Sequence, residues 1–385
     1  MKLLFSIFIL LLPTQLAYHF WPDFAFVYGV RVDYFSPTIY ATELLWLLIF
    51  ALWIIKDKSA VRKILSKWRA LVVLLVLAIV NIFFSSIPEV CAFKWLRVGE
   101  FLSLYFFIKN QKDIVQSIKV PLVVSLFLTL LLAITQIIKG GSHGGILYWL
   151  GERSFSTNTP GIALFNFLGT EMLRPYATFG HPNVLAGFSL IAFFLFIKKR
   201  GFLARTIVLI SAISVFISVS QNAWLALFLT PVVYIFSNKI KNGLAKFVRL
   251  AAVTSLFLTL PNATHAPREI IERMELNEIA GNIISQRPVF GIGLGDFVSQ
   301  LPTTSSLRSI WFLQPVHNVF LLVAAETGLV GLLFFVYFLG KNTNAKNALP
   351  VIAMVLTGLF DHYWISGFQT MMLAAIVLAI GYNKQ

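Results

Sequence analysis

The sequence predicts an all-α protein that lies in a membrane. Of its 385 residues, 58% are hydrophobic and only 12% are charged, whereas soluble domains carry roughly 25% charged residues. Apolar runs recur along the whole chain, and many approach the ~17–25 residues that a helix needs to cross a bilayer. We therefore expect residues 1–385 to form a single transmembrane domain of packed helices.

The apolar runs predict about twelve transmembrane helices. Each run is separated from the next by a polar or basic connection, or by proline and glycine, which end helices. The predicted spans cover residues 3–18, 37–55, 70–86, 92–109, 119–138, 183–197, 204–219, 222–237, 247–260, 316–339, 348–361 and 365–382.

Basic residues fall on every second connection, which fixes the predicted orientation. These connections read KDKSAVRKILSKWR, KNQKDIVQSIK, IKKRGFLAR, NKIKNGLAKFVR and GKNTNAKN. Cytoplasmic loops carry an excess of lysine and arginine, so we expect both termini to be cytoplasmic. The net charge of +15 is then a signal of membrane topology, and we expect no nucleic-acid partner.

The first apolar run, MKLLFSIFILLLPTQLAY, also looks like a secretory signal peptide. No clear A-x-A cleavage site follows it, so we expect a retained helix. Removal of this run would leave the predicted orientation of the later spans unchanged.

Two long connections, residues 139–182 and 261–315, fall on the predicted external side. All six histidines lie in external segments or at external helix ends. Residues 267–285 predict a helix, with proline at its first turn and acidic residues near its start. We expect this helix to lie across the outer surface as a structural cap.

The segment RPYATFGHPNVLAG gathers polar side chains within an apolar background. Pro182 and Pro315 each stand at or just before the start of an inward-running span, so two helix amino ends face the outside. Such ends favour anions, and Arg174 and Arg287 precede them. We therefore predict a site for a membrane-anchored phosphate. The alternative is that Arg174 pairs with Glu171 while its neighbours shape a turn.

His317 is the candidate catalytic residue. It is expected in the first turn of its helix, where the positive helix end favours a neutral imidazole. A neutral imidazole can take a proton from a hydroxyl nucleophile. The alternative is a histidine that only forms hydrogen bonds within the bundle. Three neighbours of these motifs complete the predicted substrate-binding set: His181, Asn183 and Asn318.

Other polar features favour structural interpretations. The alternating glycines of RPVFGIGLGDF lack the strand and spacing of a dinucleotide-binding motif, so we expect a turn packed against the bilayer. Glu326 lies mid-span and is expected to be structural, as is a pairing group formed by Glu100 with Lys94 and Arg97. A single cysteine and scattered histidines predict neither a metal site nor a cofactor.

Four segments resemble, in their order along the chain, the O-antigen ligase and polymerase superfamily of bacterial envelope enzymes. The resemblance covers about residues 170–335. The segments are RPYATFGHPNVLAG, SVSQNAWLAL, RPVFGIGLGDF and HNVFLLVAAETGLVG.

The resemblance implies an inverting, metal-independent glycan transfer on the outer side of the cytoplasmic membrane. The donor would be a glycan on a polyprenyl diphosphate, and the acceptor a hydroxyl on a lipid, a glycan or a protein. Arg174 would contact the diphosphate, and His317 would activate the hydroxyl. Many members carry arginine where this chain has Gln221. Either another external arginine, Arg287 or Arg153, compensates, or the donor is held differently.

The sequence therefore favours a ligase-like membrane glycosyltransferase with an external active site. A polysaccharide polymerase of the same superfamily would use the same residues and differ in its acceptor. A transporter or a flippase for lipid-linked oligosaccharides is the third alternative. Transporters usually show repeats and helices broken at the membrane midplane, and the sequence shows no repeat.

Overall fold

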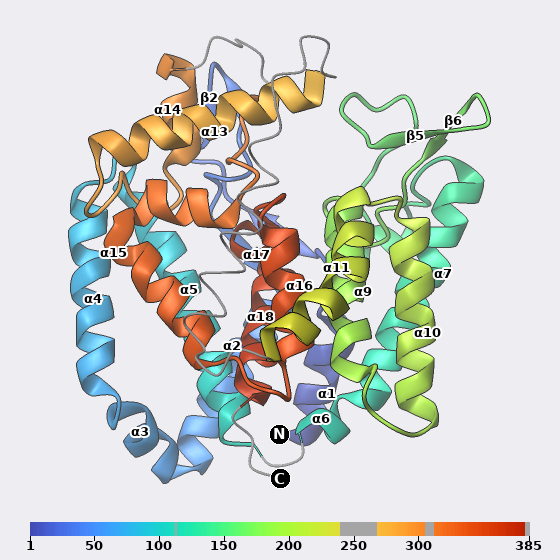
Figure 1. Ribbon diagram of the computed structural model, residues 1–385, viewed down its shortest axis with the longest axis horizontal. Coiled ribbons are helices and arrows are strands. Elements are labelled where there is room, and N and C mark those ends of the chain that lie inside the picture. The colour runs from blue at the N-terminus through green and yellow to red at the C-terminus, as the bar shows by residue number, and fades with distance from the viewer. Residues whose placement is uncertain (112–113, 239–267, 305–311, 382–385) are drawn as a thin grey trace.

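The computed structural model describes residues 1–111, 114–238, 268–304 and 312–381 (Figure 1). It is mostly helical, which confirms the predicted fold class. Every predicted span within these residues overlaps a helix, and the span predicted at 247–260 lies outside them. The helices are α1 (Lys2–Leu11), α2 (Ala41–Lys56), α3 (Lys58–Leu65), α4 (Trp68–Phe83), α5 (Pro88–Lys109), α6 (Ile114–Ser117), α7 (Lys119–Lys139), α8 (Ile146–Trp149), α9 (Pro182–Phe196), α10 (Phe202–Ile217), α11 (Gln221–Asn238), α13 (Arg268–Gln286), α14 (Phe297–Thr304), α15 (Val319–Lys341), α16 (Ala348–Gly358), α17 (Tyr363–Ser366) and α18 (Phe368–Ile380).

Two of the described helices, α7 and α15, are long and apolar enough to cross a membrane. The pair α3 and α4 would form a third span, bent by 68°. Six further helices are apolar but shorter, namely α1, α9, α10, α11, α16 and α18. The helical runs thus lie where the sequence predicts them, and several are shorter than the predicted spans.

Three small antiparallel sheets, each of two strands, were not predicted. They pair β1 (Ala17–His19) with β4 (Thr38–Tyr40), β2 (Phe26–Val27) with β3 (Val30–Arg31), and β5 (Leu164–Phe167) with β6 (Thr170–Leu173). A 3₁₀ turn, η1 (Asp23–Ala25), precedes β2. Strands this short carry too few residues for an alternating pattern to stand out.

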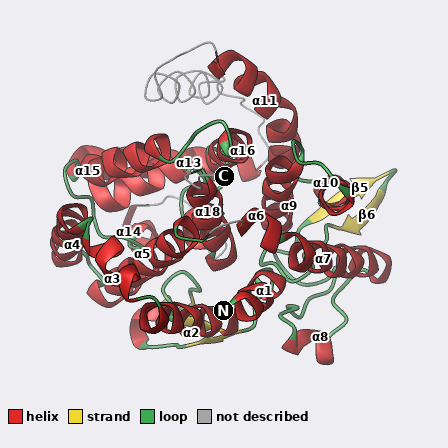
Figure 2. Ribbon diagram, turned by 90° about the horizontal axis from the view of Figure 1, so that it is seen from below, coloured by secondary structure: helices red, strands yellow, loops and turns green. Residues whose placement is uncertain are grey.

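Helix α18 lies in the middle of the molecule (Figure 2). Helices α4, α5 and α15 lie on one side of it, and α7, α9 and α10 on the other (Figures 1 and 2). Every residue of α18 and of α16 from Leu349 onward is buried. Such all-round apolar helices are typical of a core, and these two separate the halves of the bundle.

The connections divide between the two ends of the molecule. Helix α1 begins and α18 ends at the same end, where α3 and α6 of the first two basic connections also lie (Figure 1). Helices α13 and α14 and the hairpin of β5 and β6 lie at the opposite end (Figure 1). The predicted surface helix is therefore present as α13, and it packs against α15.

Helix α15 is broken at Gly328, whose φ of 69° lies outside the helical region. The glycine-rich turn fits into this break through backbone hydrogen bonds. The N–H of Gly293 donates to the carbonyl of Glu326 at 2.9 Å, and the N–H of Leu329 donates to the carbonyl of Pro288 at 2.8 Å. The segments RPVFGIGLGDF and AAETGLVG thus form one structural unit. The sequence predicted a turn packed against the bilayer, and the structure instead packs this turn against α15.

Gly328→Ala is expected to destabilise the fold strongly. An added Cβ would lie 2.1 Å from the carbonyl oxygen of Val289, and an L-residue disfavours this positive φ. Gly340→Ala, in the same helix, is the matched control because nothing lies within 4 Å of its added Cβ. Thermal unfolding in detergent should show a midpoint lower by several degrees for Gly328→Ala and nearly unchanged for Gly340→Ala. Equal midpoints for the two variants would contradict this packing.

Candidate active site

A cavity of about 1310 Å³ opens between the two sides of the bundle. Its polar part is lined from several separate segments: the start of α9, helix α13, the residues before α15, and the link between α16 and α17. The charged and polar side chains gathered there include His19, Asp33, Tyr34, Arg153, Arg174, His181, Asn183, Glu272, Arg273, His317, Asp361, His362 and Ser366.

Arg174 is positioned by the ordered end of the long connection 139–182. Strand β6 ends one residue earlier, and the N–H groups of Tyr176 and Ala177 donate to Gln136 Oε1 at 3.1 and 2.7 Å. Gln136 is fully buried near the end of α7. Its amide group also donates to Glu152 at 2.9 Å, so one side chain ties two parts of the connection to the bundle.

Asn183 joins three parts of the cavity wall. Its Oδ1 accepts hydrogen bonds from Arg174 at 2.7 Å and from Ser220 Oγ at 3.0 Å. Its Nδ2 donates to Asp361 Oδ2 at 3.0 Å. Arg174 also donates through Nε to the carbonyl of Ser218 at 3.1 Å. The arginine and the carboxylate are thus held on either side of one amide.

Asp361 is followed by a histidine that faces the candidate base. The N–H of His362 donates to Asp361 Oδ1 at 2.8 Å, and His362 Nδ1 lies 2.7 Å from Ser366 Oγ. The rings of His317 and His362 are 5.2 Å apart between centroids. His317 Nδ1 is buried and has no hydrogen-bond partner among the described residues. The hydrogen-bonding capacity of this ring nitrogen is therefore unused among the described residues.

Burial keeps these histidines neutral at pH 7. It lowers the pKa of His181 to about 4, with Arg174 and Arg273 adding to the effect and Asp361 opposing it. Burial, reinforced by His362, also holds the pKa of His317 well below its usual value of 6.5. For Asp361, burial opposes ionisation, but the charge that His362, His317 and His181 carry once they are protonated, together with the hydrogen bond from Asn183, outweighs burial and lowers its pKa.

The helix amino ends offer fewer free N–H groups to an anion than the sequence predicted. The sequence predicted His317 in the first turn of its helix. This prediction is wrong, because α15 begins at Val319, two residues later. Asn318 Oδ1 caps this end and accepts from the N–H groups of Phe320 and Leu321 at 2.9 and 3.1 Å. At α9, His181 Nδ1 accepts from the N–H of Asn183 at 3.1 Å. Side chains of the protein therefore accept hydrogen bonds from backbone N–H groups that we expected to bind an anion.

The predicted site residues divide into two groups. Arg174, His181, Asn183 and His317 all line the cavity. Arg287 is exposed and does not line it. Asn318 is buried as a helix cap and is also absent from the lining.

Several polar residues of the cavity were not predicted as site residues, among them Arg273, Asp361, His362 and Ser366. Arg273 projects from α13 and donates to the carbonyl of Phe360 at 3.1 Å, so the surface helix also contributes charge to the cavity. Arg153 was one of two arginines expected to compensate for Gln221, where many family members carry arginine. It lines the cavity and donates to the carbonyl of Gly180 at 2.9 Å. Among the described residues, no group of three or more His, Cys, Asp and Glu side chains is arranged to hold a metal ion.

Comparison with known proteins gives one family. A family model described as O-antigen ligase matches residues 184–336, from the first turn of α9 to the middle of α15. The match confirms the resemblance predicted from the sequence. No curated protein matches the chain.

Acidification is expected to weaken the fold through the buried histidines. Below pH 6.5 the unfolded chain protonates them and the folded chain does not, so stability falls as pH decreases. His181 should contribute at most about 1.3 kcal/mol between pH 7.5 and 5.5, less where cavity water screens it. Unfolding midpoints measured across this range should fall less for His181→Gln than for the wild type. Parallel curves would show that His181 titrates normally in the folded chain.

Proposed function

We propose that this chain, whose residues 184–336 match a family model described as O-antigen ligase, is a ligase-like membrane glycosyltransferase. It moves a glycan from a polyprenyl diphosphate carrier to an acceptor hydroxyl on a lipid, a glycan or another protein. The reaction inverts the configuration at the transferred carbon and requires no metal ion.

The observation that carries this proposal is that a neutral histidine and several arginines share one cavity. His317 presents a buried nitrogen without a hydrogen-bond partner among the described residues. Arg153, Arg174 and Arg273 line the same cavity. A base together with fixed positive charge is what transfer from a diphosphate to a hydroxyl requires, because a proton leaves the acceptor while negative charge builds up on the leaving group.

In the proposed step, the acceptor oxygen attacks the sugar carbon that is bonded to the diphosphate. The carbon–oxygen bond to the diphosphate breaks, and polyprenyl diphosphate leaves with the bonding electrons. His317 takes the hydroxyl proton, and the carboxylate of Asp361 stabilises the imidazolium that forms. The arginines balance the charge of the leaving group. Attack from the face opposite the leaving group accounts for inversion.

We further propose that the cavity opens toward the outside of the cytoplasmic membrane. The basic connections that contain α3 and α6 lie at the opposite end of the molecule from α13 and the β5–β6 hairpin (Figure 1). Lysine and arginine mark the cytoplasmic side. In this orientation both termini are cytoplasmic.

A polymerase reaction would use the same groups with a second lipid-linked glycan as acceptor. The length of the product distinguishes the two reactions, since a ligase attaches the donor glycan once and a polymerase extends it. If vesicles that contain the protein accumulate intact lipid-linked glycan and form no covalent product, the protein would instead be a flippase.

His317→Ala is expected to bind donor and to lose transfer. Loss of a general base typically costs ~10²–10⁴-fold in rate. Purified protein should be incubated with polyprenyl diphosphate-linked glycan and candidate acceptors, and the product followed by mass spectrometry. His143→Ala is the matched control because His143 is exposed and outside the cavity. Transfer at the wild-type rate by His317→Ala would exclude this base.

Arg174→Ala is expected to weaken donor binding by about tenfold or more, most visibly at low ionic strength, because it removes a charge that balances the diphosphate. Arg287→Ala should bind donor like the wild type, since Arg287 is exposed and outside the cavity lining. Titration with polyprenyl diphosphate measures both variants. Donor affinity that falls for Arg287→Ala and not for Arg174→Ala would reverse this assignment.

A further inference from the structure

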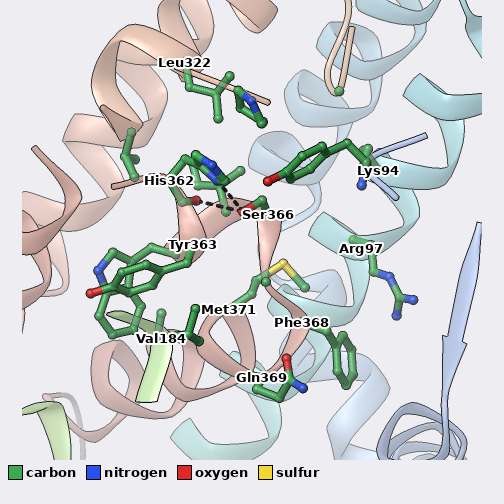
Figure 3. Close-up of a pocket in the computed structure, with 18 of the residues that line it drawn as sticks. Lys94, Arg97, Val184, Leu322, His362, Tyr363, Ser366, Phe368, Gln369 and Met371 are labelled. Atoms are coloured by element: carbon green, nitrogen blue, oxygen red, sulfur yellow. Dashed lines mark hydrogen bonds between the residues drawn. The ribbon is translucent and has the colours of Figure 1, made fainter. Parts of the chain in front are cut away.

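The cavity continues well beyond its polar part. Figure 3 shows the polar part, with His362 and Ser366 on one wall and Arg97 of α5 on the facing wall. Further along, the lining comes from α4, α5 and α15, is mostly apolar, and includes Leu71, Leu74, Phe101, Phe106, Phe334 and Phe338. Lys67, which directly precedes α4, and Tyr337, near the end of α15, also line it. The cavity therefore reaches the end of the molecule where α3 and α6 lie, which we call the basic end (Figure 1).

Three lysines come together at the basic end, each from the end of a different helix. Lys67 precedes α4, Lys109 is the last residue of α5, and Lys341 is the last residue of α15. The charges of Lys67 and Lys341 lie close enough to act on the charge of Lys109. Like charges repel one another. The fold therefore holds three helix ends together against a repulsion that an anion among the lysines would offset.

Two tyrosines fix the positions of two of these ammonium groups. Lys109 Nζ donates to Tyr105 OH at 3.2 Å, and Lys341 Nζ donates to Tyr337 OH at 3.1 Å. Tyr105 OH in turn donates to Asn342 Oδ1 at 2.7 Å, which joins the end of α5 to the end of α15. Because a tyrosine hydroxyl is uncharged at pH 7, these contacts orient the ammonium groups without neutralising them.

The chain next to Lys67 suits the headgroup region of a bilayer. From residue 56 to residue 69 it carries one acid, Asp57, and the further basic residues Lys56, Lys58, Arg62, Lys63 and Arg69. Apolar side chains of the same stretch are exposed, namely Val61, Leu65 and Trp68. Short basic helices with exposed apolar side chains lie at the surface of a bilayer. Basic pockets between membrane helices bind the phosphate headgroups of lipids.

We propose that Lys67, Lys109 and Lys341 bind the phosphate of an anionic phospholipid from the leaflet at the basic end. One acyl chain of this lipid lies between α4 and α15, along the apolar lining of the cavity. The bound lipid offsets the repulsion among the three lysines and closes the cavity at this end. It is not a substrate, because its headgroup lies at the opposite end of the molecule from Arg174 and His317. It binds whether or not the protein transfers glycans.

Phosphatidylglycerol and phosphatidylcholine test this site, because both carry a phosphate and acyl chains but only phosphatidylglycerol has a net charge. Added phosphatidylglycerol should raise the thermal unfolding midpoint of delipidated protein in neutral detergent, and phosphatidylcholine should have little effect. Titration of the midpoint gives the lipid affinity. The triple variant Lys67→Gln, Lys109→Gln, Lys341→Gln should bind phosphatidylglycerol on the order of a hundredfold more weakly, at about fivefold for each lysine near an anionic headgroup. The corresponding triple arginine variant should bind like the wild type.

Lys67→Gln alone should weaken binding about fivefold. Lys67 is exposed and its side chain makes no capping hydrogen bond to α4, so this single variant should fold like the wild type. An unchanged affinity for phosphatidylglycerol in this variant would contradict the proposed site.

The matched control removes three charges from the basic connection between α9 and α10, through Lys198→Gln, Arg200→Gln and Arg205→Gln. These residues are exposed and lie outside the cavity, so this variant should bind phosphatidylglycerol like the wild type. An equal loss of affinity in both triple glutamine variants would show general attraction to the membrane surface and would overturn a discrete site. Equal stabilisation by phosphatidylcholine, or by glycerol phosphate without acyl chains, would also overturn it.

Discussion

The candidate site depends on the side chain of Asn183, which holds three distant segments together. Its carbonyl oxygen accepts from Arg174 and Ser220, and its amide nitrogen donates to Asp361. A carboxamide suits this place because one end accepts and the other donates. A carboxylate would repel Asp361, and an apolar residue would remove the hydrogen bonds that this amide makes with Arg174 and Asp361, which is costly in a low-dielectric interior. The position of the candidate base relative to the arginine follows from this amide.

The packing that surrounds the site explains why the histidines can stay neutral. Helices α16 and α18 are buried on all sides, and the short link between α16 and α17 places Asp361 and His362 against His317. The glycine-rich turn fills the break of α15, so the helix that follows His317 is anchored to the α4–α5 side of the bundle. Burial disfavours charge on the imidazoles, and Asp361 supplies the negative charge that a transient imidazolium needs.

The sequence predicted the helices well because apolar runs in a membrane protein are a strong local signal. It predicted Arg174, His181 and Asn183 because they stand in one polar motif within an apolar background. Arg273, Asp361 and His362 reach the cavity from segments far apart in the chain, and no local pattern marks them. The short strands were missed for lack of length. His317 was expected inside its helix, but Asn318 is the better cap, since its side chain satisfies the first N–H groups. Arg287 stood beside a predicted helix end, and only the fold shows that its side chain is exposed.

An experimental structure with polyprenyl diphosphate-linked glycan bound would test the central claim most directly. The account predicts phosphate oxygens within hydrogen-bonding distance of the Arg174 guanidinium, and the sugar carbon bonded to the diphosphate facing the imidazole of His317. A diphosphate bound at the end of the molecule where α3 and α6 lie would contradict it. So would a sugar that does not reach His317 while its phosphates contact Arg174.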